Sequence, residues 1–88
     1  MFYTYVLISL KNERLYTGFT SDLKRRFNEH NEKRGGKYTS KAGPFKIIFY
    51  EAYLDKKDAM QAERFFKTGY GREVLNGKLE NYFNSIKK

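Results

Sequence analysis

Two tyrosines, one arginine and the single histidine of this chain have types and spacings that could form a reactive cluster. Tyr5 and Tyr16 lie in two short apolar segments. Arg26 and His30 follow four residues apart, in a stretch with helical periodicity. A guanidinium presents a fixed fork of donors that suits phosphate. An imidazole titrates near neutral pH, whereas a phenol, with a pKa of about 10, needs nearby positive charge before it can accept a proton.

The two apolar segments, residues 2–9 and 15–19, predict a β-hairpin because they are rich in aromatic and β-branched side chains. The first segment is apolar on both faces, which is typical of a central strand. Side chains alternate along a strand, so Tyr5 and Tyr16 share one face, either opposite each other or diagonal. Gly18 shares this face, and we expect the backbone of a ligand to come close to it.

A helix is predicted to follow, with Ser21 as candidate N-cap and Asp22 in its first turn. With about 3.6 residues per turn, His30 falls on the apolar stripe and Arg26 at its edge. Arg25 points the other way, toward solvent or a phosphate. A lone histidine on such a stripe is more often a buried structural residue than a catalytic one.

These residues carry a resemblance to a known family. The triplet Tyr-Thr-Tyr at residues 3–5, ten intervening residues, the triplet Tyr-Thr-Gly at 16–18, and then Arg26 and His30 resemble the pattern of the GIY-YIG nuclease superfamily. The first triplet lacks the family's glycine and isoleucine but keeps its last tyrosine. The chain is most similar to the small stand-alone branch, which resembles the N-terminal cleavage module of the bacterial excision-repair nuclease. The resemblance covers nearly the whole chain, since Glu63 matches the family's metal-binding glutamate.

The resemblance implies an α/β fold with a small three-stranded, mainly antiparallel sheet flanked by helices. It also implies metal-dependent hydrolysis of DNA phosphodiester bonds. Glu63 would hold one Mg²⁺ or Mn²⁺ with water and substrate phosphate, and Arg26 would neutralise the phosphate. Either Tyr5 or Tyr16 would take a proton from the attacking water, and His30 would share proton transfer or bind phosphate. These five are the expected catalytic residues.

Residues 31–44 form a predicted loop in which cations are interleaved with an aromatic ring, a composition typical of surfaces that bind nucleic acid. A solvated basic loop is the alternative for any one of its lysines. The candidate nucleic-acid-binding residues are Gly18 and Arg25 before the loop, and Lys33, Arg34, Lys37, Tyr38 and Lys41 within it.

The second half predicts a third strand at residues 45–53, a helix at 56–67 capped by Asp55, and a last helix at roughly 72–86 with an apolar stripe. Glu63 falls within the inward stripe of the first of these helices. Burying an ionised carboxylate without a partner is costly, so Glu63 needs a metal, a set of donors or a cation. A salt bridge to Arg26 and an exposed surface position are the alternatives.

Some members of the GIY-YIG family, which this chain resembles, have an asparagine near the C-terminus in the site. Asn76 and Asn81 are the candidates here. Glu63 is the single carboxylate expected at the site. A two-metal nuclease would need several acidic ligands close together, so this argues against one.

The chain has 88 residues, which leaves room for one domain, expected over residues 1–88, with one small core. Its formal net charge of +8 favours a polyanionic partner, either nucleic acid or an acidic membrane surface, although soluble basic proteins without such a partner are common. There is no cysteine, which excludes disulfides and thiolate zinc sites and suits the reducing cytoplasm. No segment has the length of a membrane span or the pattern of a signal peptide.

Three functions follow from these features. The first is a DNA endonuclease, structure-selective and linked to DNA repair or recombination, whose target is chosen by DNA structure or by a protein partner. The second is a non-catalytic nucleic-acid-binding module that retains the nuclease fold. The third is a basic interaction domain unrelated to nucleic acid.

Overall fold

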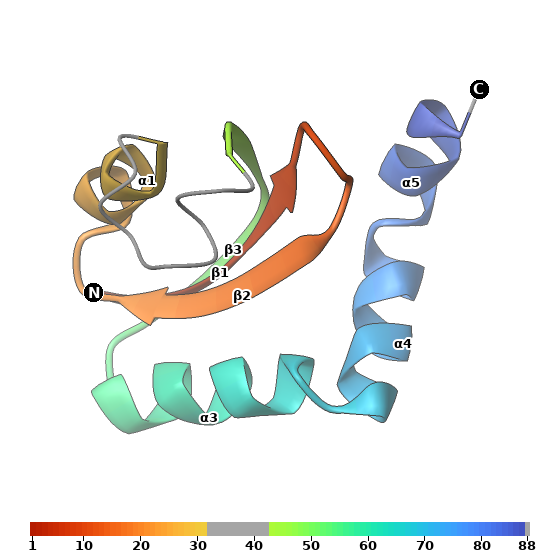
Figure 1. The fold of residues 1–88 in the computed structure, drawn as a ribbon. Coiled ribbons are helices and arrows are strands. Elements are labelled where there is room, and N and C mark those ends of the chain that lie inside the picture. The colour runs from red at the N-terminus through yellow and green to blue at the C-terminus, as the bar shows by residue number, and fades with distance from the viewer. Residues whose placement is uncertain (32–42, 88) are drawn as a thin grey trace.

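The computed structural model describes residues 1–31 and 43–87 (Figure 1). Its centre is an antiparallel sheet of three strands: β1 (Phe2–Ser9), β2 (Leu15–Thr20) and β3 (Phe45–Tyr53). The strand order is β2-β1-β3, so β1 is the central strand, as its two apolar faces predicted. The α/β fold class and the third strand are confirmed.

The register of the hairpin decides how the two tyrosines lie. Tyr5 pairs with Gly18, and Leu7 pairs with Tyr16. Tyr16 therefore lies diagonal to Tyr5, on the same face of the sheet. Of the two arrangements that the sequence allowed, the diagonal one is correct.

Four helices are described: α1 (Leu23–Asn31), α3 (Lys56–Phe66), α4 (Gly69–Lys78) and α5 (Glu80–Ile86). The helices cover opposite faces of the sheet, with α1 above it and α3 below it in the view of Figure 1. The α1 face buries a cluster built on Tyr5, Leu7 and Phe45. The opposite face buries Val6 of β1 against the helices α3 and α4. The sheet thus separates two apolar clusters.

The N-cap of helix α1 lies one residue later than predicted. Asp22, not Ser21, caps it, because the Asp22 carboxylate accepts a hydrogen bond from the backbone N–H of Arg25 at 3.0 Å. The hydroxyl of Thr20 accepts from the backbone N–H of Asp22 at 3.1 Å and fixes this turn. In α3, the predicted cap Asp55 is confirmed, since its side chain accepts from the backbone N–H of Lys57 at 2.8 Å.

The last predicted helix is wrong in its bounds, because two helices, α4 and α5, replace it. The predicted start near residue 72 is also wrong, since α4 begins at Gly69. The hydroxyl of Thr68 accepts from the backbone N–H of Gly71 at 2.9 Å, which lets α4 begin at Gly69. The predicted helix is divided at Leu79, where the backbone leaves helical geometry. The Leu79 side chain packs against the apolar cluster on the α3 face of the sheet.

Within the residues that the structure describes, no helix combines the length and the apolar character needed to cross a membrane.

Candidate active site

The phenol of Tyr5 lies directly over Gly18 of the neighbouring strand. The Tyr5 side chain is almost fully buried, with 3% of the residue exposed. A side chain at position 18 would overlap the phenol oxygen and the ring carbon that bears it. The space above Gly18, where we expected a ligand to approach the backbone, is therefore filled by the Tyr5 ring.

The Tyr5 phenol forms a hydrogen bond with the imidazole of His30, with 2.9 Å between the oxygen and Nε2. His30 is itself 5% exposed. Burial, and then the charge of Arg26, lower the pKa of His30 below its usual value. Within residues 1–31 and 43–87, the buried Nδ1 of His30 has no hydrogen-bond partner. The imidazole that contacts the phenol is therefore neutral near pH 7.

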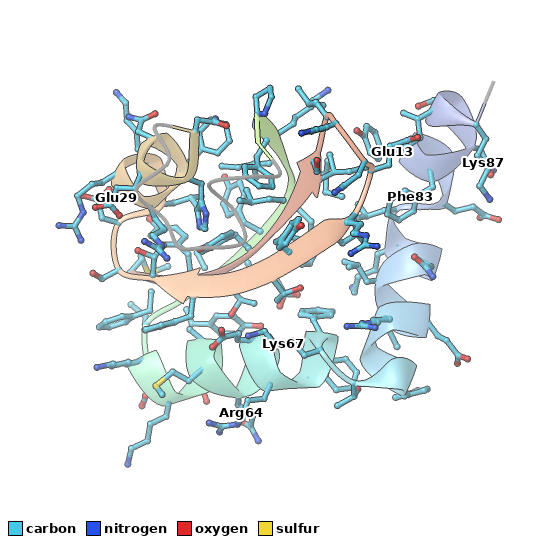
Figure 2. The ribbon with its side chains drawn as sticks, viewed as in Figure 1. Glu13, Glu29, Arg64, Lys67, Phe83 and Lys87 are labelled. Atoms are coloured by element: carbon cyan, nitrogen blue, oxygen red, sulfur yellow. The ribbon has the colours of Figure 1, made fainter. Side chains whose placement is uncertain are left out.

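Arg26 reaches the same phenol from the edge of α1. Its guanidinium lies close enough to the Tyr5 phenol to lower the pKa of that phenol through hydrogen bonding and charge. It also forms an ion pair with Glu29, at 3.3 Å between Nη1 and Oε1 (Figure 2 labels Glu29 on α1). The side chain of Arg26 is 32% exposed, so this cation can be reached from solvent. Glu29 is thus a carboxylate partner of Arg26 in the described structure.

The environment of Tyr5 keeps its phenol protonated. Burial raises the pKa of Tyr5 above its usual value, and the hydrogen bond and charge of Arg26 oppose this rise without overcoming it. The charges of Glu63 and Glu29 raise the pKa of Tyr5 further. The phenol donates to Nε2 of His30 when the proton of the neutral imidazole lies on Nδ1, and accepts from Nε2–H in the other tautomer.

Tyr16 is more accessible than Tyr5, with which it shares this face of the sheet. It is half-buried, and its ring packs edge-to-face against Phe45, with 5.3 Å between the ring centroids. His30 also packs against Phe45, with 6.0 Å between the ring centroids. Tyr16 and His30 therefore share one aromatic neighbour on the α1 side of the sheet.

Glu63 comes from the opposite layer. It lies on α3, which packs against β1 and the edge strand β2. Its carboxylate forms an ion pair with Lys67, at 3.1 Å between Oε2 and Nζ, and 24% of the Glu63 side chain is exposed. Lys67 lies on the sheet-facing side of α3, whereas Arg64 points away from the sheet (Figure 2). Glu63 is close enough to affect the pKa of Tyr5 through its charge, so the two layers meet electrostatically at the edge of the sheet.

The chemistry of Glu63 fits a magnesium or manganese ion in one respect. Mg²⁺ is often held by about one or two carboxylates, with water and substrate phosphate as its other ligands. Among residues 1–31 and 43–87, no group of three or more His, Cys, Asp or Glu side chains could hold a metal. Within these residues Glu63 is the candidate carboxylate ligand, and the ammonium of Lys67 forms an ion pair with it.

The structure does not bring the late asparagines to this cluster. Asn76 lines a pocket beside Ile8 and Leu15, near the tip of the hairpin. Asn81 is exposed on α5. Arg25 is exposed on α1. The other predicted nucleic-acid contacts, Lys33, Arg34, Lys37, Tyr38 and Lys41, lie outside the described residues.

Two residues of this region were missed at the sequence level. Glu29 lies three residues after Arg26, and Lys67 lies four residues after Glu63. Both spacings favour ion pairs on a helix, so the signal was present in the sequence.

Comparison with known proteins identifies the family. A family model described as the GIY-YIG catalytic domain matches residues 1–78. The chain belongs to the GIY-YIG family. It therefore has a nuclease-type fold. Members of the family are generally endonucleases, and they typically use divalent metals.

Several bacterial proteins are similar to this member of the GIY-YIG family. A UPF0213 protein of Streptococcus agalactiae is 48% identical over 65 residues, which cover 74% of this chain and 73% of the relative. A UPF0213 protein of Pediococcus acidilactici is 43% identical over 76 residues, covering 84% and 76%. The solution NMR structure of a UPF0213 protein from Bacillus halodurans superposes with a TM-score of 0.56 at 34% identity, covering 99% of this chain and 96% of that one.

Replacing Gly18 by alanine should displace the Tyr5 phenol, because the new methyl group would occupy its position. We expect Gly18→Ala to lose about 1–3 kcal/mol of unfolding free energy, measured by urea denaturation. The imidazole signals of His30 should shift in NMR spectra. Gly77→Ala is the matched control, since a side chain there meets nothing within 4 Å. Wild-type stability and unchanged imidazole signals in Gly18→Ala would contradict this packing.

Stability should fall in mildly acidic solution because of His30. Its pKa is lowered in the folded state, so the unfolded chain binds the proton first. The contribution of the neutral imidazole to the free energy of unfolding is complete above the pKa of about 6.5 in the unfolded chain. This contribution is lost as the pH falls through the lowered pKa of the folded state. His30→Gln should lack this component when urea denaturation at about pH 7.5 and about pH 5.5 is compared. The chain has one histidine, so an equal slope in both proteins would rule out the assignment.

Proposed function

We propose that this protein is a divalent-metal-dependent DNA endonuclease that hydrolyses phosphodiester bonds. One observation carries the proposal: the Tyr5 phenol is held between Arg26 and His30, within electrostatic reach of Glu63. A phosphate at the exposed edge of this group would meet a guanidinium, phenols and a carboxylate. The family fold supports DNA as the substrate, and the net charge of +8 favours binding to its backbone.

Arg26 is assigned to the substrate phosphate. Its guanidinium is oriented by Tyr5 and by Glu29, and its side chain is 32% exposed. An exposed ion pair such as that with Glu29 is typically worth only about 0–1 kcal/mol, so a phosphate can compete with the carboxylate. The planar fork of donors then neutralises charge that develops on the phosphoryl oxygens.

Tyr16 is assigned to the attacking water, and Tyr5 and His30 to positioning. Tyr5 is buried and keeps its proton, so it is poorly suited to accept another group's proton. Tyr16 lies diagonal to it on the same face and is more exposed. His30 lies behind Tyr5 and orients the phenol, which in turn orients Arg26.

Glu63 is assigned to the metal. With water and substrate oxygens it would hold Mg²⁺ or Mn²⁺, which supplies charge stabilisation at the leaving 3′-oxygen. We assign target choice to DNA structure, such as a branch or a nick, or to a protein partner. Such an activity suits DNA repair or recombination. The cytoplasm is the proposed location, since the chain has no cysteine to be oxidised.

Nicking of supercoiled plasmid in Mg²⁺ or Mn²⁺ tests this function. Arg26→Ala and Glu63→Gln should each reduce the rate by about a hundredfold or more, because each removes a group that contacts the transition state or its cation. Arg64→Ala is the control, since its side chain points away from the sheet (Figure 2), and should stay within about twofold of wild type. Salt-sensitive binding without nicking would favour a non-catalytic module. Neither binding nor nicking would favour a basic interaction domain.

Lys67 should compete with a divalent cation for Glu63, because its ammonium lies 3.1 Å from the carboxylate. We expect Lys67→Met to bind Mn²⁺ about two- to fivefold more tightly, as follows from the weak energy of exposed ion pairs. The measurement is calorimetric titration of Mn²⁺ without DNA. Arg64→Met has the same change in net charge and lies next to Glu63 in sequence. An equal gain in both variants would mean that only overall charge matters.

A further inference from the structure

An open pocket of about 510 Å³ lies on the α1 face of the sheet, next to the first turn of α1. This volume is within the range of about 300–1,000 Å³ that is usual for ligand sites. Tyr3 and Tyr50 line the pocket, together with the apolar residues Phe27 and Ile47. The polar residues Asp22 and Lys24 also line it.

Half-buried Tyr3 and exposed Tyr50 form an aromatic pair. Their ring centroids are 6.1 Å apart with an interplanar angle of 62°. Tyr50 is 56% exposed, although it lies in the middle of β3. Helix α1 starts at Leu23 and packs over Tyr5, Leu7 and Phe45, so it leaves this corner of the sheet partly open.

The pocket lies on the same face of the sheet as the candidate active site. Tyr50 pairs with Tyr5 across β1 and β3, and opposite residues share a face. Tyr3 precedes Tyr5 by two residues, which is about 7 Å along a strand. At roughly 3.4 Å per base, this separation corresponds to about two nucleotide steps.

The chemistry of the pocket suits an aromatic ring rather than a phosphate. Asp22 and Lys24 both line it, so the negative charge of the Asp22 carboxylate offsets the positive charge that would attract an anion. The same carboxylate already accepts the N–H of Arg25, so the first turn of α1 is capped. The aromatic pair and the apolar floor offer a stacking surface, and Asp22 can accept hydrogen bonds from amino groups at the edge of a base.

We propose that Tyr3 and Tyr50 form a binding site for an unpaired nucleobase. This inference rests on the proposed function and deepens it, because it names the DNA feature that the site recognises. A base removed from its stack enters the pocket, while its strand continues toward Arg26. Paired duplex presents no such base, so the pocket favours DNA with an unpaired nucleotide near the cleaved bond.

Fluorescence binding to two DNAs of equal length tests the proposal, one a paired duplex and one carrying an unpaired 2-aminopurine. The measurement is made in EDTA, so it does not depend on cleavage. Tyr50→Ile keeps strand propensity but removes the aromatic face. It should bind the unpaired-base DNA about tenfold more weakly and should lose the change in 2-aminopurine fluorescence. Binding of the paired duplex should stay within about twofold of wild type, and Tyr50→Phe should restore both signals.

Tyr70→Ile is the matched control, because Tyr70 is 70% exposed and packs against Phe65, away from the pocket. Equal losses in Tyr50→Ile and Tyr70→Ile, or equal losses on both DNAs, would overturn the nucleobase site. So would a wild-type protein that binds the two DNAs with the same affinity. Binding that depends on Tyr50, together with no nicking in Mg²⁺ or Mn²⁺, would overturn the proposed nuclease activity alone.

Discussion

The close approach of the Tyr5 ring to the backbone of Gly18 is the constraint on which the rest of the site depends. A side chain at position 18 would overlap the phenol, so only glycine lets the ring lie across β2. That placement fixes the oxygen 2.9 Å from Nε2 of His30 and within hydrogen-bonding reach of Arg26. The absence of a Cβ at position 18 thus fixes the positions of three side chains, one from a strand and two from a helix.

The charges of the site are balanced before any substrate arrives. Burial keeps the Tyr5 phenol protonated and the His30 imidazole neutral, and the two charged groups at the margin have partners of their own. Glu29 pairs with Arg26, and Lys67 pairs with Glu63. Both ion pairs are partly exposed, so replacing one partner by a ligand of the same charge costs little free energy. A phosphate and a divalent cation are the two ligands that would complete such an exchange.

The two faces of the sheet carry different groups of the candidate site. The α1 face carries the phenols, the guanidinium and the imidazole, and also the open corner at Tyr50. The α3 face carries most of the helical packing, and Glu63 reaches the site from there beside the edge strand β2. An edge strand allows this because, among the described residues, no further strand separates the two layers at that side. The position of β2 at the edge therefore affects the electrostatics around Tyr5 as well as the packing of the sheet.

The sequence by itself determined the three strands, the central place of β1, the helix capped by Asp55 and the family, because these depend on local periodicity and on short motifs. It left open whether Tyr5 and Tyr16 are opposite or diagonal, since register depends on how the turn closes. Tertiary structure alone decided that the ring of Tyr5 fills the space at Gly18 and that burial outweighs Arg26 in setting the pKa of Tyr5. Burial, and the competition of one charge with several neighbours, are properties of the packed chain, and no spacing of residues along the sequence encodes their balance.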